Sequence, residues 1–129
     1  MQSAVRGGVM TLRLLWIINV VLGIYISYIA KNPGGWVLAH MATGILIVAL
    51  LWFVGVAQGL QKNGSLGITI ATFLVGLALP IVGMAQLAVP DGAGLYGIQG
   101  LHLILALAAI ALGEISGSRY RKSLAAAAA

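Results

Sequence analysis

Hydrophobic and polar positions along the chain divide it into four long apolar segments with short polar breaks between them. A helix needs about 20 apolar residues to cross the hydrocarbon core of a bilayer. The segments do not alternate in polarity, so they favour helices over the strands of a barrel. The predicted spans are approximately 12–30, 36–57, 66–88 and 95–115. We therefore expect an all-α, integral membrane four-helix bundle that forms a single domain over residues 1–124.

The breaks between the spans are rich in glycine, proline and asparagine, which are typical of turns. They cover residues 31–35, 59–65 and 90–94, and none of them is long enough to hold a soluble domain. The alanine run at 125–129 is a low-complexity tail to which we assign no role.

Composition agrees with a membrane protein and excludes several kinds of site. Only 7% of the residues are charged and the mean hydropathy is +1.08, whereas a soluble domain is about 25% charged. The chain has no cysteine, which excludes disulfides, zinc–thiolate sites and iron–sulfur clusters. Its net charge of +5 is spread over a very apolar chain, so we expect no nucleic-acid partner, and the lipid bilayer is its immediate surroundings.

The basic residues predict the orientation in the membrane. Six of the seven lie on one side of the predicted spans, and the exception is Lys31. The six are Arg6, Arg13, Lys62, Arg119, Arg121 and Lys122. Because cytoplasmic segments carry the excess of lysine and arginine, we expect both termini in the cytoplasm. The protein would be a multi-pass protein of a prokaryotic plasma membrane.

The two histidines of the chain have the same predicted depth. His40 lies about five residues into the second span and His102 about seven into the fourth, and both spans run from outside to inside. Each therefore lies about 8–10 Å below the outer end of its helix. Ionisable residues inside a membrane are functional candidates by default, although a single such histidine can simply bond a neighbouring helix.

Superposing the two histidines aligns the halves of the chain 62 residues apart, with the small residues Gly44 and Ala106 each four positions further on. This indicates two helix-hairpin repeats related by an axis along the membrane normal. Two inward-facing imidazoles suit the axial ligation of a heme iron. Small residues, including Gly44, Ala106 and Gly100, would leave a slot for it. Candidates to meet the heme propionates at the outer surface are Lys31, Gln99, Trp36 and Tyr96.

Four other polar residues of the spans have less specific expectations. Asn19, Thr43 and Gln86 are interpreted as helix–helix hydrogen-bonding residues. Glu114 lies near the inner end of the fourth span, close in sequence to Arg119 and Arg121. We expect it to form an ion pair or to reach cytoplasmic water.

Two short segments resemble a known family. Residues 38–48, LAHMATGILIV, resemble the second helix of one half of heme A synthase, and residues 100–108, GLHLILALA, are similar to its fourth helix. The resemblance implies a heme between His40 and His102 near the outer face. That family has a glutamate one turn before the first histidine, where this chain has Val37, and a cysteine pair that is missing here. The resemblance therefore implies the cofactor site rather than the synthase chemistry.

The first functional hypothesis is a small cytochrome subunit with a bis-histidine heme b, or another heme type, that transfers electrons within a larger respiratory or photosynthetic membrane complex. A quinol or a redox protein at the outer face would be its exchange partner. One alternative is a single-bundle enzyme similar to heme A synthase. The other is a structural accessory subunit without a cofactor.

Overall fold

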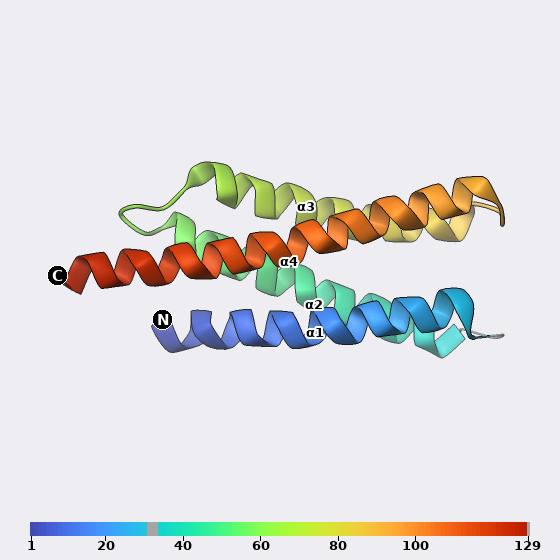
Figure 1. Ribbon diagram of the computed structural model, residues 1–129, viewed down its shortest axis with the longest axis horizontal. Helices are drawn as coiled ribbons and strands as arrows, with labels where there is room; N and C mark the ends of the chain where they lie inside the picture. Colours follow the sequence, from blue (N-terminus) through green and yellow to red (C-terminus); the bar gives the residue numbers. More distant parts are fainter. Residues whose placement is uncertain (31–33, 129) are drawn as a thin grey trace.

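The computed structural model describes residues 1–30 and 34–128, and these residues form a four-helix bundle without strands (Figure 1). Each of the four helices is long and apolar enough to cross a membrane. This confirms the all-α class and the expectation of four helices that are long and apolar enough to span a membrane. The helices are α1 (Gln2–Tyr28), α2 (Gly34–Gly59), α3 (Leu66–Ala85), which continues into the short 3-10 turn η1 (Gln86–Ala88), and α4 (Ala93–Ala128).

Two helices extend well beyond the predicted spans at the same end of the molecule. α1 already begins at Gln2, and α4 continues through the alanine tail to Ala128. Alanine has the highest helix propensity, so the tail prolongs the helix. With 36 residues, α4 is about 54 Å long, which is longer than the hydrocarbon core is thick, about 30 Å. Part of α4 therefore lies outside the apolar layer.

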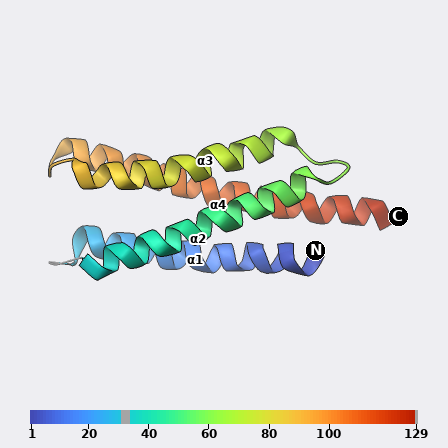
Figure 2. The ribbon, with the colours of Figure 1, turned by 180° about the vertical axis from the view of Figure 1, so that it is seen from behind.

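The bundle consists of two antiparallel hairpins, α1–α2 and α3–α4. α2 and α4 contact each other and both remaining helices, while α1 and α3 do not touch. Both chain ends lie at one end of the bundle, which we call the terminal end (Figure 1). We call the opposite end, where α1 connects to α2 and α3 to α4, the distal end. The two hairpins lie further apart there than at the terminal end, in front and rear views alike (Figure 2).

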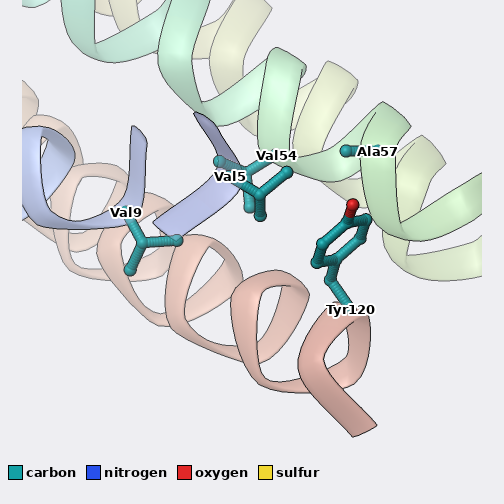
Figure 3. Close-up of a cluster of buried hydrophobic side chains, with 5 residues drawn as sticks. All are labelled: Val5, Val9, Val54, Ala57 and Tyr120. Atoms are coloured by element: carbon teal, nitrogen blue, oxygen red, sulfur yellow. The ribbon is translucent and has the colours of Figure 1, made fainter. Parts of the chain in front are cut away.

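The buried core occupies the middle of the bundle and its terminal end. One cluster joins three helices near the chain ends and consists of Val5, Val9, Val54, Ala57 and Tyr120 (Figure 3). A second cluster lies at mid-height and consists of Val48, Leu51, Leu79 and Ala109. In the described residues nearer the distal end, no side chain is fully buried. The distal half therefore has no close-packed core of its own.

Close packing of α2 on α3 depends on two glycines. A Cβ added to Gly55 would collide with the side chain of Thr72, and one added to Gly59 would collide with Thr69. Small residues four apart let helix backbones approach closely inside a membrane. This contact holds the two hairpins together at the terminal end.

Candidate functional site

The two histidines face each other between the hairpins. His40 comes from α2 and His102 from α4, and their ring centroids are 6.2 Å apart, with the ring planes at 51°. Both side chains are partly buried. α2 and α4 are the two helices that contact each other across the bundle, so the residues at matched positions on them meet at its centre.

This separation matches two imidazoles that bind one metal ion from opposite sides. An imidazole nitrogen binds a metal ion at about 2 Å, and it lies about 1 Å from its own ring centroid, so opposite ligands have centroids about 6 Å apart. The observed 6.2 Å agrees with that value. Within the described residues, no group of three or more His, Asp or Glu side chains could hold a metal ion. The pair therefore suits a metal whose other ligands come from a cofactor, as in heme.

A cavity of about 370 Å³ surrounds the pair in the distal half of the bundle and is lined by all four helices and η1. Cofactor and ligand sites are typically cavities of about 300–1,000 Å³ with mostly apolar walls and a few polar groups. The walls here include Val48, Leu79 and Leu103, and the two histidine rings are among the few polar groups. The cavity can therefore accept an apolar cofactor between the rings.

The ring of His40 is oriented by the neighbouring helix α1. Its Nδ1 lies 3.1 Å from the backbone carbonyl oxygen of Asn19. Because a carbonyl oxygen only accepts, Nδ1 carries the proton and Nε2 keeps its lone pair for a metal. The side chain of Asn19 is itself fixed, since Thr43 Oγ1 donates to its Oδ1 at 2.6 Å. The ring edge also packs on Gly23, where a Cβ would lie 3.3 Å from Cε1.

The ring of His102 lies against α3 in a similar way, beside the backbone carbonyl of Leu79. A Cβ on Gly83 would lie 3.1 Å from its Cε1, so the absence of a side chain there makes room for the ring. Its Nδ1 is buried, and within the described part of the chain it makes no hydrogen bond of ideal geometry. The two histidines therefore have similar surroundings, each against a backbone carbonyl and a glycine of the preceding helix.

Three of the other predicted site residues line the cavity: Gly44, Ala106 and Gln99. Gly44 lies beside the Asn19 amide, where a Cβ would be 3.6 Å from Nδ2. The backbone carbonyl of Ala106 accepts a hydrogen bond of 2.9 Å from Nε1 of Trp16. This bond connects α1 to α4 on the wall of the cavity.

Among the described residues, Gly100, Trp36 and Tyr96 do not line the cavity. Gly100 is exposed, with open space where its Cβ would be. Trp36 is 50% exposed and packs edge-on against Tyr25, with ring centroids 5.4 Å apart. Tyr96 is also exposed and is not part of the cavity wall. Lys31 lies outside the described residues.

The sequence did not indicate that Gly23 and Gly83 support the two rings, and it indicated Asn19 only as a helix–helix hydrogen-bonding residue, which it is, through Thr43. Gly23 and Gly83 make room for them, and the backbone of Asn19 orients one of them. A signal was present, because Gly23 and Gly83 are 60 residues apart, close to the 62 that separate the histidines. Aligning the first and third spans at an offset of 60 residues would have paired the two glycines.

Glu114 forms its ion pair with Arg13, across the α1–α4 contact. Arg13 binds both carboxylate oxygens, with its Nη2 at 2.6 Å from Oε2. Sequence spacing pointed to the nearby Arg119 and Arg121, whereas the partner is 101 residues away. The pair is partly exposed on the outside of the bundle.

Comparisons of this chain with protein-family models, with characterised proteins and with solved structures find no match. The resemblance of the two histidine segments to heme A synthase therefore stays a prediction. What the site does is inferred from its own geometry.

Proposed function

We propose that this protein is a small membrane cytochrome that holds one heme, most simply heme b, between His40 and His102 and transfers electrons through it. The observation that carries the proposal is the pair of facing imidazoles, 6.2 Å apart at the centroids, inside an apolar cavity. Membrane-embedded histidines at matched positions on facing helices are a common way to hold a cofactor inside a bundle.

The residues around the pair have separate roles in this proposal. Nε2 of His40, whose other nitrogen bonds the Asn19 carbonyl, would bind the heme iron from one hairpin, and His102 would bind it from the other. Gly44 and Ala106 keep the cavity wall free of bulky side chains beside the rings. The mostly apolar lining would limit the access of water to the heme. The heme would supply a one-electron redox couple, and two histidine ligands leave no open position for substrate chemistry, which favours electron transfer.

The orientation and the partners are part of the same proposal. Arg6, Lys62 and Arg121 lie toward the terminal end, so that end would face the cytoplasm of a prokaryotic cell. The cavity would then lie near the outer face, within reach of a quinol in the membrane or of a redox protein outside it. In this proposal the protein acts as a subunit of a larger membrane complex.

The hairpins α1–α2 and α3–α4 are, in this view, two copies of one structural unit. Each places a histidine of its second helix against a glycine of its first helix: His40 against Gly23, and His102 against Gly83. A heme on the axis between two such units would receive one equivalent ligand from each.

The test is an absorption spectrum of the purified full chain in detergent, reduced minus oxidised, with pyridine extraction to identify the heme. We expect sharp low-spin bands, one heme per chain, and loss of those bands in His40→Ala and in His102→Ala. Gly100→Ala is the matched control, because its Cβ would meet open space, and it should keep the spectrum.

Two results would lead to the alternative functions. A chain that stays colourless after hemin addition would contradict the proposal and favour a structural accessory subunit. Production of heme A on coexpression with a source of heme O would instead favour an enzyme similar to heme A synthase.

A further inference from the structure

The charged side chains at the terminal end of the bundle are unbalanced. The chain has only two acidic residues, and one of them, Asp91, lies in the connection between η1 and α4 at the distal end. The other, Glu114, is bound through both of its oxygens by Arg13. Acidic side chains therefore supply no separate carboxylate for the five other basic residues toward the terminal end, which are Arg6, Lys62, Arg119, Arg121 and Lys122.

Two of these five residues lie along the line of contact between α1 and α4, which we call the α1–α4 seam. Arg6 is seven residues before Arg13 on α1, and Arg121 is seven residues after Glu114 on α4. Seven residues are close to two full helical turns, so each arginine lies on the same edge of its helix as its member of the ion pair. Because α1 and α4 are antiparallel, both arginines lie about 10 Å closer to the terminal end than the pair does.

The side chain of Arg121 lies in the seam itself. A Cβ added to the buried Gly117 would lie 3.5 Å from Nη1 of Arg121 and 2.7 Å from Cγ2 of Val9. The guanidinium group therefore lies over Gly117, one turn back along α4 and beside a residue of α1. Arg6 and Arg121 are both exposed, and within the described residues neither forms a salt bridge. Their guanidinium groups are thus open to an anion from outside the chain.

The depth of the two arginines matches that of lipid headgroups. Tyr28 and Tyr96 lie near the distal ends of α1 and α4, where aromatic residues of membrane proteins meet the bilayer surface. The helix rise is about 33 Å from Tyr28 to Arg6 and about 38 Å from Tyr96 to Arg121. The hydrocarbon core is about 30 Å thick, and the bilayer with its headgroups about 40–45 Å. Both guanidinium groups would therefore lie beyond the hydrocarbon core, at the headgroup layer.

The same helix edges become apolar toward the distal end. Four side chains continue them and are each between 48% and 56% exposed: Ile17, Ile24, Leu103 and Leu107. They lie four and eleven residues after Arg13 on α1, and seven and eleven residues before Glu114 on α4, so the helical period places them on these edges. A molecule with a phosphate at the arginines and hydrocarbon chains below it would cover both parts of this surface.

We propose that Arg6 and Arg121 bind the phosphate of one anionic phospholipid, such as phosphatidylglycerol, whose acyl chains lie along the exposed apolar edges of α1 and α4. Guanidinium groups bind phosphate oxygens through paired, charge-assisted hydrogen bonds. The seam carries three arginines and one glutamate, so its excess of two positive charges favours a headgroup without a cation of its own. Binding of this lipid requires no heme, so the inference stands apart from the proposed function.

The test is native mass spectrometry of the full chain in detergent, titrated with phosphatidylglycerol or with phosphatidylcholine of the same acyl chains. We expect the wild type to bind one phosphatidylglycerol in preference to phosphatidylcholine. In Arg6→Gln/Arg121→Gln this lipid should bind about 25-fold more weakly, because each basic residue near an anionic surface contributes about fivefold. Lys62→Gln/Arg119→Gln is the matched control, since it removes the same charge beside the α2–α3 connection, where Arg119 bonds the Asn63 carbonyl. It should keep the wild-type affinity.

Three results would overturn the inference. An equal loss in both double variants would mean diffuse attraction to the whole basic end rather than a site at the seam. A wild type without preference for phosphatidylglycerol would remove the basis for an anionic lipid. Displacement of the lipid by millimolar inorganic phosphate would make the seam a site for a free anion. All four substituted side chains are exposed, so each variant should keep the wild-type helix content by circular dichroism.

Discussion

Nε1 of Trp16 donates a 2.9 Å hydrogen bond to the backbone carbonyl of Ala106, 90 residues away in the sequence. The bond joins α1 to α4 beside the histidine pair, on the wall of the cavity. It closes the side of the cavity at which α1 and α4 meet.

Trp16→Phe removes this hydrogen bond and keeps an aromatic ring in place. A hydrogen bond of this kind contributes about 0.5–1.5 kcal/mol, so we expect a loss of stability within that range and a less tightly closed cavity. Unfolding of the purified chain in mixed detergent micelles measures the loss. Trp36→Phe is the matched control, because Trp36 is half exposed and does not line the cavity. An equal effect of the two variants would contradict the prediction.

Thr43→Val tests the support behind His40. It removes the 2.6 Å bond to Asn19 Oδ1 and should cost about 1 kcal/mol of stability. We also expect the tautomer preference of His40 to weaken, as seen by 15N NMR, because Asn19 is then held less firmly. Thr43→Ser keeps the hydroxyl and should restore both properties. If Thr43→Val leaves the His40 signals unchanged, Thr43 does not position this ring.

Gly55→Ala tests the close contact of α2 with α3. The added methyl group would collide with Thr72, and overpacking of this kind costs about 1–3 kcal/mol. Gly100→Ala adds the same methyl group on an exposed helix surface with open space, and it should be neutral or slightly stabilising because alanine is the better helix former. Unfolding curves of both variants check the prediction, which fails if the two substitutions have the same effect.

Glu114→Gln leaves the Arg13 guanidinium without its bidentate partner. An unpaired charge next to lipid is unfavourable, so this variant should unfold more readily than the wild type. In Arg13→Gln/Glu114→Gln both charges are gone, and we expect part of the stability to return. A double-mutant cycle of unfolding measurements gives the coupling between the two residues. Additive effects of the two single substitutions would show that the pair contributes nothing.

The absence of cysteine permits a direct test of orientation. Asn63→Cys lies between α2 and α3 at the terminal end, and Asp91→Cys lies between η1 and α4 at the distal end. A maleimide that does not cross membranes should label Asp91→Cys in intact cells, and Asn63→Cys only after the cells are opened. The reverse pattern would mean that the terminal end faces outward and that the cavity lies near the cytoplasm.

The sequence by itself predicted the four membrane helices, because the crossing of a bilayer depends on the length and hydrophobicity of each segment. It did not predict where the helices end. α1 extends to Gln2 because Val5 and Val9 pack against α2 and α4, and this contact depends on residues far along the chain. The ion pair between Arg13 and Glu114 was likewise not predicted from the sequence, because the two residues are 101 positions apart.

For the candidate site, too, some features followed from the sequence and others required the tertiary structure. The equal depth of His40 and His102 follows from counting residues along two parallel helices, and so does the placement of Gly44 and Ala106 one turn further on. The facing of the two rings, their 6.2 Å separation and the bond from His40 to Asn19 required the tertiary structure. The rotation and tilt of each helix decide which side chains face the cavity, and the packing between helices sets this rotation and tilt. For that reason Gln99 lines the cavity and Gly100, its neighbour in the sequence, does not.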